Sequence, residues 1–335
     1  MAKNILEIKN LTFSFHTYGG VVKSVRDVSF NVREGEILGI VGESGCGKSV
    51  TSQCILKLNP EPPGFFEGGS IKYKGEEIIT KTDREMRKIR GVEIGFIFQD
   101  PMTSLNPTMT VGKQIEEVFV GRKGMTRAEV RERALEILRL VGINEPERRY
   151  KQYPHELSGG MKQRTVIAIS TILSPKVLIA DEPSSALDVT SQKMVIKMMR
   201  DLMEKGFIKS MIFITHELPL LYNVTDDIMV MYAGQIVEKG TAKEMVFDPL
   251  HPYSKGLMGS IIVPEEGVRE QKLTAIPGTP PNLKHPPEGC RFADRCPYAQ
   301  PTCRGMKPEV IELPNGREYR CLMSERKVRE VYANA

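Results

Sequence analysis

Hydrophobic and polar positions follow two different patterns along the chain. Between residues 5 and 33 apolar and polar side chains alternate, which predicts antiparallel strands with one buried face. The segments 37–41, 176–180 and 211–215 are short and almost continuously apolar, as in strands that are buried on both faces. Buried strands separated by helices predict an α/β fold, with helices on both faces of a parallel sheet.

A helical block of about residues 102–173 lies between these strands. It contains the capping-box pattern Thr126-Arg127-Ala128-Glu129, which marks the start of a helix. Apolar residues follow at helical spacing: Val130, Ala134, Ile137, Leu138 and Val141. We therefore expect a helical subdomain inserted into the sheet domain.

The amino-acid composition of the chain changes after residue 255. Six prolines accumulate there: Pro264, Pro277, Pro280, Pro281, Pro286 and Pro287. Such a stretch is typical of a linker or an irregular segment that wraps over a surface. The pattern predicts a main domain over 1–255 and a C-terminal extension over 256–335.

Composition narrows the class of protein. The chain has 335 residues, of which 40% are hydrophobic and 27% charged, as in ordinary globular proteins. No apolar run approaches the ~18 residues that a membrane span needs, and the N-terminus has no apolar signal region, so we expect a cytoplasmic location. A net charge of +5 could suit an anionic membrane face but is weak evidence for nucleic-acid binding.

A glycine-rich motif follows the first apolar strand. Gly42-Glu43-Ser44-Gly45-Cys46-Gly47-Lys48-Ser49 fits G-x-x-x-x-G-K-[ST], and a plausible helix begins at Val50. Glycines allow backbone N–H groups to point at phosphate oxygens, and the helix N-terminus adds a positive end. Lys48 would reach the β- and γ-phosphates, and Ser49 would bind Mg²⁺. The strand–loop–helix context argues against a chance glycine-rich turn.

Two carboxylates end the second buried strand. Asp181 and Glu182 follow the apolar residues 177–180, and open α/β sheets bind ligands at the carboxyl ends of their strands. Asp181 would hold Mg²⁺, and Glu182 would act as general base on the attacking water. Asp-Glu-Pro is also common in solvated turns, so this assignment depends on the phosphate loop being present in the same chain.

The order of further motifs resembles the ATPase subunit of an ATP-binding-cassette (ABC) transporter. Gln99 follows the apolar residues 94–98, Leu-Ser-Gly-Gly-Met-Lys-Gln occupies 157–163, Ser-Ala-Leu-Asp occupies 185–188, and His216 ends the last apolar strand. These resemble the family's Q-loop, signature motif, D-loop and switch histidine. The resemblance covers about residues 5–250. It implies an ABC cassette of the P-loop NTPase class, with a RecA-like core, an antiparallel β-subdomain and a helical insert.

The resemblance also implies roles for individual residues. Gln99 would sense Mg²⁺ and the lytic water, His216 would contact the γ-phosphate, and Glu182 would be the base. Ser158 is also a good N-cap for a helix that follows it. Ser158 and Gly160 would face the ATP held by a second cassette, so that two cassettes enclose two ATP molecules head to tail. The implied nucleotide and magnesium residues are Tyr18, Gly42, Ser44, Gly45, Cys46, Gly47, Lys48, Ser49, Val50, Gln99, Ser158, Gly160, Asp181 and Asp188. Tyr18 is the candidate for stacking on adenine, and Phe15 or His16 could serve instead.

Four cysteines lie close together in the extension. Cys290, Cys296, Cys303 and Cys321 have the spacing C-x₅-C-x₆-C-x₁₇-C. A cytosolic cluster suggests metal before disulfide, and the absence of a C-x₂₋₄-C pair favours a [4Fe–4S] cluster over Zn²⁺. We expect a structural metal centre. Because all nucleotide motifs precede residue 217, we expect replacement of Cys296 to leave ATP binding largely intact.

The extension resembles that of dipeptide/oligopeptide importer ATPases, and nickel importers share much of it. The resemblance rests on His251-Pro252-Tyr253, on Pro-Gly-Thr-Pro-Pro at 277–281 and on the segment around Cys290 and Cys296. It implies a peripheral subunit on the cytoplasmic face of the membrane. The implied partners are a second, related but distinct ATPase, two transmembrane permease subunits and, indirectly, an extracytoplasmic substrate-binding protein, with no nucleic acid.

Two alternative functions have less support in the sequence. A soluble cassette ATPase of DNA repair or the ribosome typically has a long coiled-coil insertion or two cassettes, whereas this chain has one phosphate loop and a short insert. An iron–sulfur redox protein with a vestigial cassette would not need the complete motif set. The sequence favours an ATPase of a peptide importer.

Overall fold

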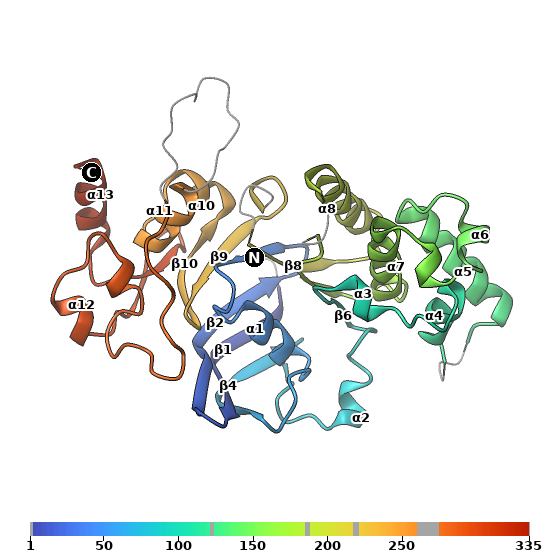
Figure 1. Cartoon of the computed structure of the whole chain (residues 1–335), viewed down its shortest axis with the longest axis horizontal. Helices are drawn as coiled ribbons and strands as arrows, with labels where there is room; N and C mark the ends of the chain where they lie inside the picture. The colour runs from blue at the N-terminus through green and yellow to red at the C-terminus, as the bar shows by residue number, and fades with distance from the viewer. Residues whose placement is uncertain (1–2, 121–123, 185–187, 217–220, 260–274, 335) are drawn as a thin grey trace, which may run out of the picture. The chain divides into compact units, whose positions relative to one another are not determined.

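A computed structural model describes residues 3–120, 124–184, 188–216, 221–259 and 275–334. The chain forms two compact units, one of residues 1–80 with 215–335 and one of residues 81–214. Figure 1 shows the elements of both. We call them unit 1 and unit 2 and describe each by itself.

The alternating N-terminal segment forms an antiparallel sheet in unit 1, as predicted. Its strands are β1 (Asn4–Thr17), β2 (Gly20–Arg33), β4 (Gly64–Tyr73) and β5 (Glu76–Glu77), in the order β2-β1-β4-β5. Ile8 pairs with Phe30 and Leu11 with Val28, so that apolar residues of facing strands share one buried face. Both strands are drawn in blue in Figure 1.

A second group of strands in unit 1 carries the phosphate loop. Its order is β11 (Val310–Glu312), β12 (Glu318–Arg320), β10 (Gln235–Thr241), β9 (Asp227–Tyr232) and β3 (Ile37–Val41). β3 runs parallel to β9, and the other pairs are antiparallel. All five residues of β3 are buried, as the continuous apolar run predicted.

The helices of unit 1 are short. They are α1 (Lys48–Ile55), α10 (Ala242–Phe247), α11 (Pro252–Gly259), α12 (Thr302–Gly305) and α13 (Glu325–Ala333), with a 3₁₀ turn η2 (Ala293–Arg295). Thr241 caps α10 in a full capping box with Glu244, which satisfies N–H groups that the first helical turn leaves open.

The C-terminal extension is attached to the rest of unit 1 through sheet pairing and a buried ion pair. β12 pairs with β10 at Glu238↔Tyr319. Glu238 is fully buried and accepts from Arg317 Nη2 at 2.6 Å, with both side chains almost entirely removed from water. Leu250, which precedes the extension, belongs to one apolar cluster with Tyr319, Met323 and Val328. One residue that precedes the extension therefore completes a cluster that the extension otherwise supplies itself.

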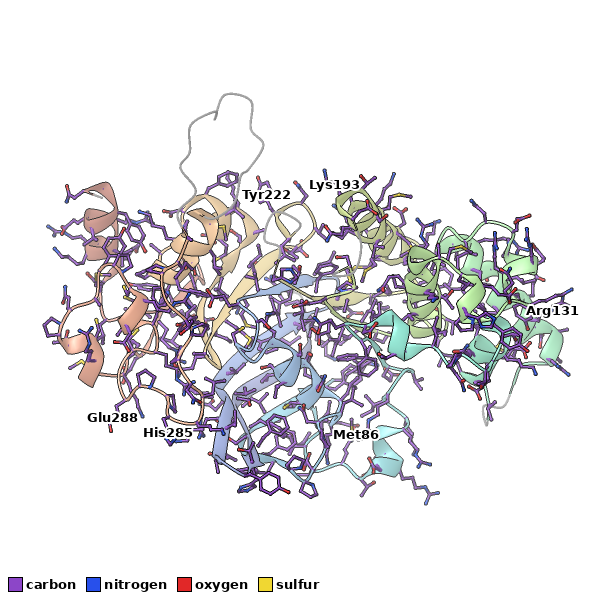
Figure 2. All side chains as sticks on the ribbon, viewed as in Figure 1. Met86, Arg131, Lys193, Tyr222, His285 and Glu288 are labelled. Carbon is purple, nitrogen blue, oxygen red and sulfur yellow. The ribbon has the colours of Figure 1, made fainter. Side chains whose placement is uncertain are left out.

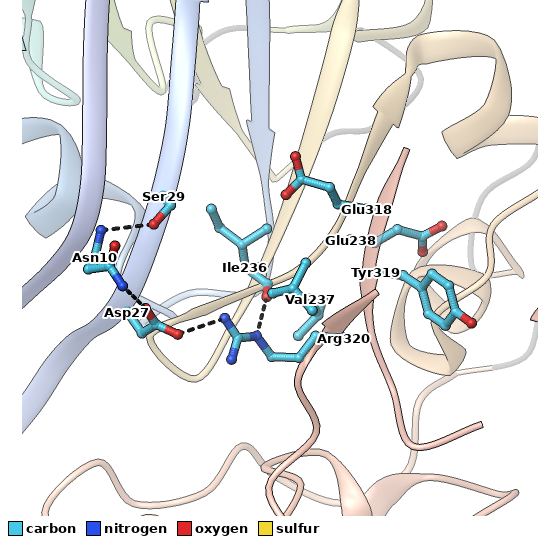
Figure 3. A pocket seen from close by; sticks show the side chains of 10 residues that line it. Asn10, Asp27, Ser29, Ile236, Val237, Glu238, Glu318, Tyr319 and Arg320 are labelled. Atoms are coloured by element: carbon cyan, nitrogen blue, oxygen red, sulfur yellow. Dashed lines mark hydrogen bonds and ion pairs between the residues drawn. The ribbon is translucent and has the colours of Figure 1, made fainter. Parts of the chain in front are cut away.

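Arg320 adds a third attachment, at a cavity of about 280 Å³ between β2, β10 and β12. Figure 3 shows its guanidinium between Asp27 and the backbone of Ile236. Nη2 lies 3.1 Å from Asp27 Oδ2, and Nε donates to the Ile236 carbonyl at 3.2 Å. Asn10 Nδ2 donates to the other oxygen of Asp27 at 3.0 Å, which fixes that carboxylate.

Unit 2 combines parallel strands with the predicted helical block. β8 (Ser210–Thr215), β7 (Val177–Asp181) and β6 (Ile94–Ile97) are parallel, with Ile94 opposite Val177. The helical elements are α2 (Asp83–Met86), α3 (Pro101–Ser104), α4 (Val111–Glu117), α5 (Arg127–Leu140), α6 (Pro146–Arg149), η1 (Pro154–Glu156), α7 (Gly159–Thr171) and α8 (Val189–Glu204). The capping box predicted at Thr126 is present at the start of α5.

The exposed face of α5 carries mostly charged residues. The guanidinium of Arg131 on α5, labelled in Figure 2, lies 5.8 Å from the centre of the Tyr150 ring. The opposite face of α5 is apolar and buried at the predicted positions Val130, Ala134, Ile137 and Leu138. α5 is therefore an amphipathic helix that covers the interior of the block.

Candidate functional site

The phosphate loop connects β3 to α1, and two of its glycines are required by close packing. A Cβ at Gly42 would lie 2.2 Å from the carbonyl oxygen of Met231, and one at Gly47 would lie 2.6 Å from that of Ser24. Gly47 also has a φ of 103°, a region that favours glycine. Ser44 and Gly45 are exposed at the tip of the loop. The loop is therefore packed at its two ends and open in the middle.

Lys48 lies beneath this loop and is almost completely buried. Its Nζ donates to the carbonyl oxygens of Gly42 at 2.7 Å and Glu43 at 3.2 Å. The neighbouring thiol of Cys46 is also buried, and burial raises its pKa, so that it stays protonated. The ammonium group is thus held within the curl of the loop. Ser49 and Val50 follow it in the first turn of α1 and are half-buried.

The structure adds contacts to the loop that sequence reasoning missed. Tyr253 of α11 accepts from the Glu43 N–H at 2.9 Å, and Arg295 binds the Glu43 carboxylate. His251, two residues before Tyr253, is fully buried, and burial lowers its pKa to about 3. The neutral ring accepts from the Tyr253 N–H at 3.0 Å. These residues belong to segments that were noted only as family signatures.

The acidic strand end lies in unit 2. Asp181 is the last residue of β7 and is buried, and Glu182 follows with a φ of 46°. The Glu182 N–H donates to the Ile214 carbonyl at 2.9 Å. Its carboxylate Oε2 accepts from Gln99 Nε2 at 2.9 Å. Unit 2 therefore brings together two of the predicted site residues, Gln99 and Glu182, which are 83 positions apart in the sequence.

The signature segment forms a capped helix start. Ser158 accepts from the Met161 N–H at 3.3 Å and is the N-cap of α7, as predicted. Neither Gly159 nor Gly160 would bring an added Cβ within 4 Å of a neighbouring heavy atom. An exposed helix start with open space at its two glycines suits an approaching anion.

The remaining predicted residues lie on several different elements. Asp188 is the N-cap of α8, and its Oδ2 accepts from Ser191 Oγ at 2.6 Å; this bond lowers the pKa of the carboxylate. His216 is exposed just after β8. Tyr18 is fully exposed at the turn between β1 and β2. Ser185, Ala186 and Leu187 of the predicted D-loop lie outside the described residues.

The four late cysteines gather without forming a recognisable metal site. Their thiols are not joined in disulfides. Burial, followed by the nearby Cys321 and Cys303 thiols, raises the pKa of Cys290 to about 11, and similar causes raise that of Cys296 to about 12. Within the described part of the chain, however, no three His, Cys, Asp or Glu side chains are placed to hold a metal. The predicted [4Fe–4S] cluster is therefore not supported by the arrangement of these thiols.

Comparison with known proteins decides the family. The ABC transporter family model matches residues 25–185, and the model of the oligopeptide/dipeptide transporter C-terminal region matches residues 237–303. The chain is 54% identical to the oligopeptide transport ATP-binding protein OppD of Bacillus subtilis (strain 168), over 92% of this chain and 86% of that protein. This chain belongs to the ABC transporter family. More closely, it is a member of the oligopeptide/dipeptide transport ATP-binding proteins, and it is an ATPase.

Further relatives agree with this membership of the ABC transporter family. The dipeptide transport ATP-binding protein DppD of Bacillus subtilis (strain 168) is 46% identical over 97% of this chain and 96% of that protein. A dimeric ATP-binding cassette solved in a post-hydrolysis state with ADP and Pi has a TM-score of 0.63 and 28% identity. The match covers 71% of this chain and 98% of the chain in that structure. Among the described residues, no helix combines the length and apolarity needed to cross a bilayer.

Proposed function

We propose that this chain is the ATP-hydrolysing motor subunit of a peptide importer. The observation that carries the proposal is the hydrogen bond between Gln99 Nε2 and Glu182 Oε2, in a chain 54% identical to an oligopeptide transport ATP-binding protein. This bond connects the proposed base to the chain that enters the helical block. A change at the reacting phosphate can therefore be passed to a surface that contacts other subunits.

Each predicted residue has a proposed part in hydrolysis. Lys48 and the loop N–H groups bind the β- and γ-phosphates, while Ser49 and Asp181 hold Mg²⁺. Glu182 takes a proton from the attacking water, with Gln99 orienting its carboxylate. His216 contacts the γ-phosphate. Ser158 and Gly160 serve the ATP of a partner cassette, which the dimer seen in a structural neighbour supports. Tyr18 stacks on adenine.

The proposed partners follow from the family. Two transmembrane permease subunits and an extracytoplasmic binding protein complete the importer, and a related but distinct cassette is the second ATPase. The proposed location is the cytoplasmic face of the membrane. The proposed domains are the cassette over 1–255, with its helical subdomain at about 102–173, and the extension over 256–335.

Uptake measurements test the substrate. A strain without this chain is expected to lose uptake of labelled di- or oligopeptides, and the wild-type gene should restore it, whereas Glu182→Gln should not. Loss of nickel uptake with normal peptide uptake would assign the chain to a nickel importer instead. Unchanged uptake of both would contradict the importer assignment.

Substitutions at the exposed positions after Gln99 should separate hydrolysis from transport. Thr103 and Pro107 are exposed between the Q-loop and α4, away from the phosphate loop in sequence. We expect Thr103→Arg combined with Pro107→Arg to keep the basal ATPase of the isolated subunit within about twofold, yet to abolish uptake. Lys9→Glu, at an exposed position of β1, is the matched control and should preserve both activities. Normal uptake in the double variant would exclude this surface as the docking site.

A metal centre at the four cysteines stays a proposal with its own test. The proposal rests on the four-cysteine spacing in the sequence, since the described side chains are not placed to hold a metal. Two backbone N–H groups do donate to the sulfurs, from Gln300 to Cys303 Sγ at 3.4 Å and from Met323 to Cys321 Sγ at 3.5 Å. We expect anaerobically purified protein to be brown and to contain iron and acid-labile sulfide. Zinc without iron would identify Zn²⁺ instead. Metal-free protein with a protease-resistant tail would exclude both.

A further inference from the structure

Every polar group of Glu43, the second residue of the phosphate loop, is engaged within unit 1. Its N–H donates to Tyr253 Oη at 2.9 Å, and its carbonyl oxygen accepts from Lys48 Nζ at 3.2 Å and from the Cys46 N–H at 3.3 Å. Its carboxylate accepts two bonds from Arg295, at 2.8 Å from Nη1 and 3.0 Å from Nη2. A residue held at both backbone groups and both carboxylate oxygens has little freedom to move.

Arg295 is itself fixed from several sides. It lies in the turn η2 of the C-terminal extension, and its side chain is only 7% exposed. Nε donates to the Pro277 carbonyl at 2.8 Å, and Nη1 also donates to Tyr232 Oη at 3.2 Å. A bidentate pair of hydrogen bonds between a guanidinium and a carboxylate is both strong and directional. The Glu43 side chain is 26% exposed, so solvent screens this pair only in part.

Tyr253, which accepts from the Glu43 N–H, is itself held in place by packing. Its ring is fully buried and lies 4.5 Å from the Tyr232 ring and 5.4 Å from the Phe292 ring, measured between centroids. Phe292 comes from the extension, and its neighbour Arg291 donates to the Ala233 carbonyl. The extension therefore contributes both a charged contact to the loop and part of the aromatic packing beneath it.

We propose that Arg295 is a positioning residue for the nucleotide site, acting through Glu43 with the help of Tyr253. The Glu43 carbonyl is one of the two acceptors that hold the Lys48 ammonium group, and the turn from Glu43 to Cys46 sets the curl of the loop. An extension that holds Glu43 therefore holds the loop in a shape prepared for phosphate, which lowers the cost of ordering it on binding. This inference rests on the proposed binding of ATP at the loop.

The test measures nucleotide affinity and turnover in the full chain. For Arg295→Gln we expect the dissociation constant for a fluorescent ATP analogue, and the KM for ATP, to rise about tenfold. We expect kcat to stay within about twofold, because Glu182 and Gln99 are untouched. Tyr253→Phe keeps the aromatic packing and removes only the acceptor of the Glu43 N–H, so it should give a smaller rise in the same direction. Exchanging the charges, with Glu43→Arg and Arg295→Glu together, should recover part of the affinity lost in either single variant.

Arg320→Gln is the matched control. Arg320 also connects the extension to the rest of unit 1, through Asp27 and Ile236, but it does not contact the phosphate loop. A rise in KM for Arg295→Gln but not for Arg320→Gln, at similar melting temperatures, would support the proposal. Equal KM values in both variants and the wild type would overturn it. If Arg295→Gln does not fold, Arg295→Lys and Tyr253→Phe decide in its place. A wild-type chain that binds no ATP would instead contradict the proposed function.

Discussion

Replacing Glu182 by glutamine is expected to lower kcat for ATP hydrolysis by about 10²–10⁴-fold, the usual contribution of a general base. The amide has nearly the same shape, and one of its ends can still pair with Gln99, so the local structure should persist. It cannot accept a proton from water at neutral pH. Nucleotide binding should be retained, because Lys48 and the phosphate loop belong to a different part of the chain.

Phosphate release and ATP binding, measured on the same preparation, check this result. Size-exclusion chromatography with ATP should show a stabilised dimer, since the closed form cannot reopen by hydrolysis. Glu136→Gln, on the exposed side of α5, is the matched control and should keep wild-type turnover. Substantial steady-state hydrolysis by the Glu182 variant would remove this residue from the role of base.

Lys48→Ala should act on binding rather than on chemistry. The buried ammonium group holds the carbonyl oxygens of Gly42 and Glu43, and it is the only side-chain cation in the motif 42–49. Removing one member of a buried, hydrogen-bonded charge pair, here Lys48 with a bound phosphate, costs about 2–5 kcal/mol. We therefore expect the dissociation constant for ATP to rise about 30-fold or more.

Isothermal titration calorimetry with MgATP can measure this change in affinity. Lys57→Ala is a suitable control, because Lys57 lies just beyond α1 and its Nζ donates to the Ile79 carbonyl instead of to the loop. Unchanged affinity in the Lys48 variant would mean that phosphate is bound elsewhere. Loss of affinity in both variants would show that the measurement reports general damage to unit 1.

Features coded by short stretches were predictable from the sequence. The period-two pattern gave β1 and β2, the continuous apolar runs gave β3, β7 and β8, and Thr126 and Ser158 were placed correctly as helix caps. Local chemistry determines these features, because a strand face, a cap or a glycine turn involves only neighbouring residues. The glycines of the phosphate loop belong to the same class, although their close contacts with Met231 and Ser24 do not.

Contacts between distant segments were not predictable. Arg295 and Glu43 are 252 positions apart, and nothing in a single sequence indicates that a proline-rich tail returns to the phosphate loop. For the same reason, the position of Cys296 after all nucleotide motifs does not make ATP binding independent of it. Its neighbour Arg295 contacts the loop directly, so we now expect a Cys296 variant that loosens the tail to weaken ATP binding as well.

The ion pair between Arg317 and Glu238 has a consequence for how this chain can be shortened in evolution. Glu238 lies in β10, but its charge is balanced by an arginine near the C-terminus, and both side chains are almost wholly buried. A gene that ended after α11 would remove this counter-ion together with strand β12, which pairs with β10 at Glu238, and with the apolar residues packed on Leu250. Breaking a buried ion pair costs about 3–5 kcal/mol where the remaining charge stays buried, which is a large fraction of the stability of a typical domain. Stop mutations in the tail should therefore lower the amount of folded chain in the cell, whichever substrate is imported.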